Sequence, residues 1–585
     1  MRRLLLALLA AAALLALSGP VSARAAQDQP HPEVPQAVAL SSTPPVGRTL
    51  SSSRVLAIAS ALAKMRALKR EYRGSFGDVY LKGTARWQVS FFTANGKKEI
   101  GLVILADDGR VLEQWTGFQV AWTMARGYPG AFGEHVNALY VWLPLCVLFL
   151  LPFLAYSRPL SLHNLDLLAL LSFSVSLAFF NHAHIYASVP LAYPPLLYLL
   201  ARMLWLLRRR SRPGGRATER PLALLVPAPW LVVGVIFLVG FRIGLNASDS
   251  NVVDVGYAGV IGAQRITTDR PLYGHYPSDN EHGDTYGPAN YEAYVPFEQI
   301  FGWSGSWDDL PAAHAAAIFF DLLSVALLFL LGRRMRGPTL GVALAYAWVS
   351  YPFTLFALER NANDTLVAAF VLAALLAASY AGPLAGRGAG TLATAVRGAF
   401  AALAGLTKLA PLALAPLLAT HGLRALPPGR PWLRVRMLLV YGVGFAGAGA
   451  LAFVPALSHD TLHTIYERTL VYQANRGSPF SVWGLYGLHT GEVIAEAAAV
   501  ALALALALLP RREDLVGLAA GCAAILIAVQ LGMEHWFYLY IPWFFPLVML
   551  ALLGRYGSRE AATQLAPGAA SEPARSSPRA AALSS

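Results

Sequence analysis

Long apolar runs separated by short polar breaks dominate the chain. Most of these runs approach the roughly 20 residues that a helix needs to cross a bilayer. They lie at about residues 138–156, 162–182, 189–207, 222–243, 311–332, 338–357, 364–381, 437–457, 491–509, 514–531 and 536–554. This pattern predicts a mainly α-helical, polytopic membrane protein.

One further apolar stretch, residues 394–421, is long and is interrupted by Thr407, Lys408 and Pro411. A single crossing there would place the basic segment 424–436 on the outer side, against the positive-inside rule. We therefore expect the stretch to enter and return as two half-helices, with Lys408 near the outer tip. The total is then about 12–13 apolar passes.

The N-terminal quarter of the chain has a different pattern. Residues 1–25 have the basic start, apolar core and small-residue cleavage site of a signal peptide, although an uncleaved anchor is the alternative. Residues 26–50 are rich in Pro and Ser and predict a linker. A helix capped at Ser51 and extending to about Tyr72 should follow, then strands over 87–92, 100–106 and 111–115. This order resembles the small PepSY-type domains, and we assign residues 51–136 to such an α+β domain, with a binding or regulatory role.

Composition and charge agree with a membrane protein. The chain is 56% hydrophobic and 14% charged, whereas soluble domains average about 25% charged. Its net charge of +13 comes mainly from arginines in short loops, so it sets orientation in the membrane and does not indicate nucleic-acid binding. We expect a bacterial cytoplasmic membrane protein with an outer N-terminal domain and a disordered cytoplasmic tail at 556–585. The two cysteines lie in apolar runs and predict no disulfide framework.

The predicted topology places several polar stretches on the same outer face. These are the loops 244–310 and 458–490, the short segment 359–364 and the region around His535, all on the side of Lys408. Charged groups at membrane depth are costly unless they are paired or functional. The outer face is therefore where we expect a site.

The residues on this face carry a family resemblance. The motifs, in chain order, are Asp254 followed by Tyr257, Arg270-Pro-Leu-Tyr273, Tyr286-Gly-Pro288, Asn361 with Asn363, Thr407-Lys-Leu-Ala-Pro411, Arg476-Gly-Ser-Pro-Phe-Ser-Val-Trp-Gly484 and His535-Trp-Phe-Tyr-Leu-Tyr540. Together they resemble the GT-C class of membrane glycosyltransferases, most closely the family-87 mannosyltransferase-like group. The resemblance covers residues 222–555, so the helices within 137–221 and everything before them are additions to that core.

The resemblance implies an inverting glycosyltransferase. A mannose-like sugar or a pentose would move from a polyprenyl-phosphate donor to a lipid, glycan or protein acceptor on the outer face. A carboxylate would act as the base, and cations would hold the phosphate leaving group. The candidate bases are Asp254 and, as a rival, Asp284. The candidate phosphate ligands are Lys408, Arg468, Arg476, Arg360 and His535, and the candidate sugar or acceptor ligands are Tyr257, Tyr273, Tyr286, Asn361 and Asn363.

Other interpretations of the same residues stay open. No cofactor is expected to be required, although Asp279, Glu281, His282 and Asp284 have the oxygen-rich character of a divalent-cation site. Asp254 could instead cap a helix, and the tyrosines could belong to an interfacial belt. The rival functions are a transporter or flippase for a lipid-linked or polar solute, and a sensor or scaffold that uses the N-terminal domain.

Overall fold

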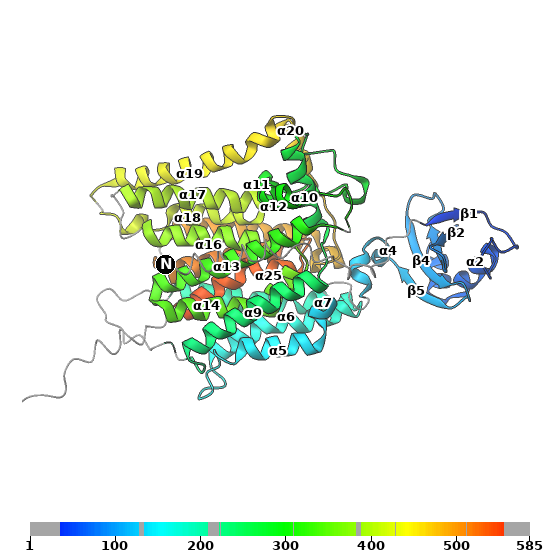
Figure 1. The fold of residues 1–585 in the computed structure, drawn as a ribbon, viewed down its shortest axis with the longest axis horizontal. Helices are drawn as coiled ribbons and strands as arrows, with labels where there is room; N and C mark the ends of the chain where they lie inside the picture. Colours follow the sequence, from blue (N-terminus) through cyan, green and yellow to red (C-terminus); the bar gives the residue numbers. More distant parts are fainter. Residues whose placement is uncertain are drawn as a thin grey trace, which may run out of the picture.

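The computed structural model describes residues 35–127, 134–208, 222, 224–307, 309–381, 388–427, 429–509 and 512–554. The expected signal peptide, the first part of the linker, the basic loop 209–221 and the C-terminal tail lie outside these residues. The described chain is mainly α-helical, with a small sheet domain at one end of a large helical bundle (Figure 1).

The sheet domain is an antiparallel meander with the strand order β1-β2-β3-β4-β5. The strands are β1 (Gln36–Val38), β2 (Phe76–Lys82), β3 (Arg86–Phe92), β4 (Glu99–Ala106) and β5 (Val111–Thr116). The last three confirm the predicted strands. β2 was not predicted, because Gly77 and Asp78 weaken its alternation of apolar and polar residues, and β1 lies inside the predicted linker.

Two helices cover one face of this sheet. The predicted helix is broken at Leu62, whose ψ is 141°, into α2 (Ser52–Ala61) and α3 (Ala63–Glu71). The Ser51 side chain accepts a hydrogen bond from the Arg54 N–H, which confirms the predicted cap. The core between the helices and the sheet includes Trp87 and Phe91.

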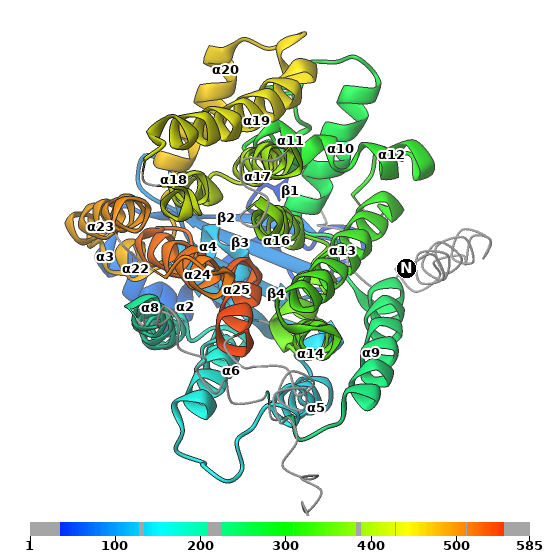
Figure 2. The same ribbon diagram turned by 90° about the vertical axis from the view of Figure 1, so that its left-hand side faces the viewer.

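The helical bundle contains eight helices that are long and apolar enough to cross a membrane, among the described residues, or nine if the bent pair α14 (Pro338–Ser350) and α15 (Pro352–Glu359) is one span. The eight are α6 (Leu162–Asn181), the stretch Ile185–Arg208 that comprises α7 and α8, α9 (Ala228–Asp249), α13 (Pro311–Arg336), α16 (Asp364–Ala381), α19 (Pro431–Leu457), α23 (His489–Leu508) and α24 (Leu515–Gly532). The shorter helix α25 (Ile541–Leu553) is buried inside the bundle, whereas α5 (Leu139–Leu150) lies at its edge beside α14 (Figure 2). The chain is a multi-pass membrane protein.

The interrupted stretch 394–421 reverses direction at Lys408, as predicted, but its two arms are unequal. The outgoing arm, α17 (Gly388–Thr407), is a full 20 residues. The return arm consists of the single 3-10 turn η4 (Ala410–Leu414) and the short helix α18 (Ala415–Thr420), which lies beside α17 (Figure 1). Pro411 and Pro416 fall in the first turns of these two pieces, where proline costs no helical hydrogen bond.

The polar stretches fold into short helices at the end of the bundle that faces the sheet domain (Figure 1). They are α10 (Asp254–Thr267), η3 (Ser278–Asn280), α11 (Pro288–Glu292), α12 (Val295–Phe301), α20 (Leu462–Tyr466), α21 (Tyr472–Ala474) and α22 (Val482–Tyr486). A hydrophobic core of their own, which includes Tyr257, Tyr273, Tyr291 and Tyr294, holds α10, α11 and α12 together.

Candidate active site

A cavity of about 370 Å³ lies where these outer segments meet the bundle. Its polar lining comes from the segment after η3, from the end of α17, from α21 and the segment after it, from the start of α23, and from the segment between α24 and α25 with the first turn of α25. The polar and aromatic lining residues are Thr285, Tyr286, Lys408, Gln473, Arg476, Glu492, Glu496, Glu534, His535, Tyr540 and Trp543. Four residues predicted from sequence, namely Tyr286, Lys408, Arg476 and His535, therefore line one cavity.

Lys408 forms the buried cationic end of this cavity. Its ammonium donates to Asp364 Oδ1 over 2.6 Å, and the indole N–H of Trp543 donates to the same oxygen over 2.9 Å. The ammonium also lies 5.1–5.8 Å from the ring centres of Tyr286, Tyr540 and Trp543, where the faces of aromatic rings attract a cation. Asp364 Oδ2 is buried and has no hydrogen-bond partner among the described residues. The pair thus keeps unused hydrogen-bonding capacity.

Arg476 and His535 lie beside this cationic end. The His535 Nδ1 is 2.9 Å from the Ser478 hydroxyl, which ties together the two segments that carry Arg476 and His535. Burial, together with the positive charges of Arg476 and Lys408, lowers the pKa of His535 well below its usual range. The imidazole is therefore neutral near pH 7, so it can contact an anion through an N–H group but adds no positive charge.

Asp254 begins α10, and the extended segment before it is fixed to the bundle. The N–H groups of Asn251 and Val253 donate to the carbonyls of Glu359 and Arg360. The buried side chain of Asn361 donates to Ser250 Oγ and to the Asn251 carbonyl, each over 2.9 Å. Asn361 has a φ of +49°, a left-handed conformation that asparagine tolerates better than most residues. Asn361 therefore positions the Asp254 segment and is not a lining residue of the cavity.

Gly256 makes this fixed position possible. A Cβ atom at Gly256 would lie 2.2 Å from the Asn361 carbonyl oxygen, so only glycine lets the first turn of α10 approach so closely. The close approach holds the exposed Asp254 carboxyl at the helix start.

The Asp254 charge acts on the cavity. Burial and the Asp254 carboxylate raise the pKa of Tyr286 well above its usual value, while Arg476 opposes this shift. Asp254 also interacts electrostatically with Lys408 and Tyr540. The charges of Asp254, Lys408 and Arg476 therefore all act on the residues that line the cavity.

Asp284, the rival base, has a different environment. It is fully buried and accepts two hydrogen bonds from Arg468, from Nε over 2.7 Å and from Nη2 over 2.8 Å. The Gly274 N–H also donates to Asp284, over 2.5 Å. This bidentate pair uses both carboxylate oxygens. It fastens the large outer loop to the 458–490 segment and leaves neither partner facing the cavity.

The remaining predicted residues lie outside the cavity lining. The hydroxyl of Tyr257 donates to Asp279, and that of Tyr273 donates to the Tyr286 carbonyl. The amide of Asn363 donates to Asn290 over 2.7 Å, and buried Arg360 lies over the Phe356 ring. These contacts hold the outer segments together.

The four residues considered for a cation are not brought together. Asp279 binds the Tyr257 hydroxyl, Asp284 binds Arg468, and His282 packs on the Tyr472 ring. Within the described residues, a closer group is His489, Glu492 and Glu534, whose ligand atoms lie within 4.8 Å of one another.

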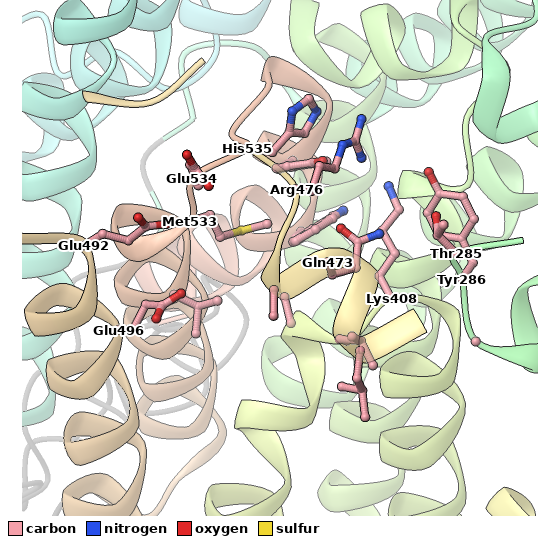
Figure 3. A pocket seen from close by; sticks show the side chains of 18 residues that line it. Thr285, Tyr286, Lys408, Gln473, Arg476, Glu492, Glu496, Met533, Glu534 and His535 are labelled. Carbon is pink, nitrogen blue, oxygen red and sulfur yellow. The ribbon is translucent and has the colours of Figure 1, made fainter. Parts of the chain in front are cut away.

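The opposite wall of the cavity was not predicted. Glu492, Glu496 and Glu534 face Lys408 and Arg476 across it (Figure 3). Glu492 and Glu496 are spaced i, i+4 at the start of an otherwise apolar helix, and this spacing is a pattern that could have identified them. The cavity therefore has a cationic side and an anionic side.

This arrangement suits the binding of a phosphate ester that carries a polar, hydroxyl-rich group. The cations and N–H donors can hold the phosphate. The aromatic rings and carboxylates can contact a sugar. The exposed carboxylate of Asp254 is not a lining residue, but its charge acts on the lining residues and it can accept a proton.

Comparisons with known proteins give a limited likeness. No family model matches the chain, and no curated protein matches it. The crystal structure of ArnT from Cupriavidus metallidurans bound to undecaprenyl phosphate aligns with 56% of this chain at 18% identity and a TM-score of 0.37. The cryo-EM structure of arabinosyltransferase EmbB from Mycobacterium smegmatis aligns with 63% of it at 17% identity and a TM-score of 0.34. The alignments span 60% and 33% of those two proteins, which is less than two thirds of either.

Proposed function

We propose that this protein is a GT-C-type membrane glycosyltransferase that uses a polyprenyl-phosphate-linked sugar. The observation that carries the proposal is the cavity in which Lys408 and Arg476 lie within the electrostatic reach of Asp254. On the motifs described above, we assign residues 222–555 to a family-87-like core and residues 51–136 to a PepSY-like domain. The sugar would be mannose-like or a pentose, and the cavity would open on the outer face of a bacterial cytoplasmic membrane.

In the proposed reaction Asp254 acts as the general base. Its carboxylate takes the proton of an acceptor hydroxyl, and that oxygen attacks the anomeric carbon of the donor with inversion. The bond between the anomeric carbon and the phosphate oxygen breaks, and its electron pair leaves with the polyprenyl phosphate. Lys408 and Arg476 stabilise the negative charge that grows on this oxygen. The neutral His535 adds an N–H contact.

The other candidate residues support this centre. Tyr286 lies beside Lys408 and offers an aromatic face to the sugar ring. Asp284 and Arg468 are occupied by each other, so the proposal assigns them to the framework of the site. The acceptor would be a lipid, glycan or protein.

The test is a transfer assay in membranes that contain the wild type, Asp254→Asn or Asp269→Asn. Asp269 is a matched control, because it is an exposed carboxylate on the same outer loop and pairs with His459. A panel of radiolabelled polyprenyl-phosphate sugars would be offered with endogenous acceptors.

We expect incorporation from one donor with the wild type and Asp269→Asn, and a loss of about 100-fold or more with Asp254→Asn. Full activity of Asp254→Asn would refute its assignment as the base. The absence of incorporation from every donor, with folded protein, would refute the enzyme class.

A further inference from the structure

Residues 117–127, called the folded linker below, are the described part of the chain that leads from the sheet domain toward the bundle. It contains the short helix α4 (Phe118–Ala121) and the 3-10 turn η1 (Thr123–Arg126). The Arg126 guanidinium donates to the carbonyls of Gln119 and Val120, and the Gln119 amide donates to the Ala125 carbonyl. These bonds fold residues 119–126 back on themselves.

This folded linker is attached at both ends. On the sheet side, Val120 is 6% exposed and packs with Leu102, Ile104 and Trp115 on the sheet face opposite α2 and α3. On the bundle side, Phe118 packs edge-on against Tyr186. Gly127 lies so close to the turn after α6 that a Cβ atom there would be 2.2 Å from the Ala183 nitrogen.

Between these attachments the linker presents Trp122 to the cavity residues. The indole stacks on the His535 ring at 5.9 Å and meets Phe480 edge-on at 5.2 Å. The Arg476 guanidinium lies 6.0 Å from the centre of the indole. One side chain from the N-terminal part therefore contacts both segments that carry the cavity's Arg476 and His535.

We propose that Trp122 is a positioning residue, through which the docked sheet domain holds Arg476 and His535 in the geometry that binds the ligand's phosphate. The Ser478–His535 hydrogen bond is a direct link between their two segments. Trp122 adds a second link by stacking on the imidazole and facing the guanidinium. The identity of the ligand rests on the proposed function, but the positioning does not.

Ligand binding at the cavity should therefore depend on the sheet domain being docked. A partner or ligand that moved the sheet domain would move Trp122 away from His535 and weaken phosphate binding. The N-terminal domain would then act as a regulatory part of the enzyme.

The test compares four full-length proteins: the wild type, Trp122→Leu, Trp122→Phe and Trp230→Ala. Trp122→Leu removes the aromatic face but keeps an apolar side chain, while Trp122→Phe restores a ring. Trp230 is a matched control, because it is a tryptophan of α9 that is 68% exposed and has no part in the cavity. Hydrogen exchange and the binding of undecaprenyl phosphate would be measured on each detergent-purified protein.

We expect Trp122→Leu to exchange about tenfold faster in residues 476–482 and 533–537, with the strands of the sheet domain unchanged. Binding of undecaprenyl phosphate should weaken by about tenfold. Trp122→Phe should restore most of the wild-type exchange rate and lipid binding, and Trp230→Ala should match the wild type in both.

Unchanged exchange in those two segments would overturn the inference, whether or not the lipid binds. Faster exchange across the whole sheet domain would also overturn it, because Trp122 would then serve only the stability of that domain. Faster exchange in the two segments, with no undecaprenyl phosphate bound by the wild type, would support the positioning role and contradict the proposed use of polyprenyl-phosphate-linked donors.

Discussion

The Asp284–Arg468 and Asp364–Lys408 pairs both join a carboxylate to a cation in the outer half of the molecule, and the two carboxylates differ in how fully their hydrogen bonds are used. In the Asp284–Arg468 pair, both carboxylate oxygens accept hydrogen bonds from Arg468, and a backbone N–H adds another. In the Asp364–Lys408 pair, a single oxygen accepts from both donors, and the other oxygen is buried with no partner in the part of the chain that the structure describes. The first pair joins the large outer loop to the 458–490 segment, whereas Lys408 of the second pair lines the cavity.

This difference distinguishes a pair that supports the fold, Asp284–Arg468, from a pair that belongs to the candidate site, Asp364–Lys408. In the first pair, both carboxylate oxygens are bonded to one guanidinium, so the geometry of the carboxylate is fixed. A buried ammonium with one carboxylate contact and three aromatic neighbours retains the ability to bind an anion. Residue type alone does not distinguish the two pairs, because each joins an aspartate to a basic residue.

The largest effect should come from Lys408→Met. This change leaves Asp364 buried without its counter-charge, which costs about 3–5 kcal/mol of stability, and it removes a ligand of the proposed phosphate. We expect a lower melting temperature in detergent and no detectable transfer.

The double variant Asp364→Asn/Lys408→Met separates these two effects. It should recover most of the lost stability without recovering transfer, because no buried charge is left unpaired. Recovery of transfer in the double variant would mean that Lys408 serves only to neutralise Asp364.

Arg468→Gln should destabilise the protein somewhat less, by about 2–3 kcal/mol, because Arg468 is 29% exposed and Asp284 keeps its backbone hydrogen bond. Transfer per folded molecule should stay within about threefold of the wild type, since the pair does not line the cavity. A loss as complete as that of Lys408→Met would remove the distinction between the two pairs.

Gly256→Ala should reduce transfer by about 10- to 100-fold, because its Cβ would collide with the Asn361 carbonyl and displace Asp254. Gly244→Ala is the control, since a Cβ there meets open space. The measurement is the transfer rate at a saturating donor concentration. Equal rates for both variants would show that the position of Asp254 is not critical.

The smallest effect is a pH dependence of stability. Because the folded state lowers the pKa of His535, the unfolded chain binds this proton more readily below about pH 6.5. Stability should therefore fall as the pH drops through that value, by at most about 1.4 kcal/mol per pH unit from this group. His535→Asn should show a shallower fall in melting temperature than the wild type. Parallel profiles would show that His535 is not the group responsible.

The sequence allowed part of this site to be predicted. Lys408 stood out because a charge inside an apolar stretch is costly, and Arg476, Tyr286 and His535 stood in motifs on one predicted face. The multi-pass fold followed from the spacing of the apolar runs, and three strands followed from alternation and turn residues.

Other features depend on contacts between distant residues. Asp284 and Arg468 are 184 positions apart, and no local sequence pattern indicates that they form an ion pair. Glu492 and Glu496 belong to an apolar run, and that run predicts a membrane-spanning helix and not a site. Trp122 contacts His535 and Arg476 because the folded linker packs against the bundle, and no pattern in the local sequence indicates this packing.

The most direct test of the account is the binding of undecaprenyl phosphate to purified protein, compared between Arg476→Gln and Arg468→Gln. Both changes remove one positive charge from the same outer segment, but Arg476 lines the cavity and Arg468 is bound to Asp284. We expect the wild type and folded Arg468→Gln to bind the lipid equally, and Arg476→Gln to bind it about tenfold or more weakly. Equal binding by both variants, or weaker binding only for Arg468→Gln, would contradict the assignment of this cavity as the phosphate site.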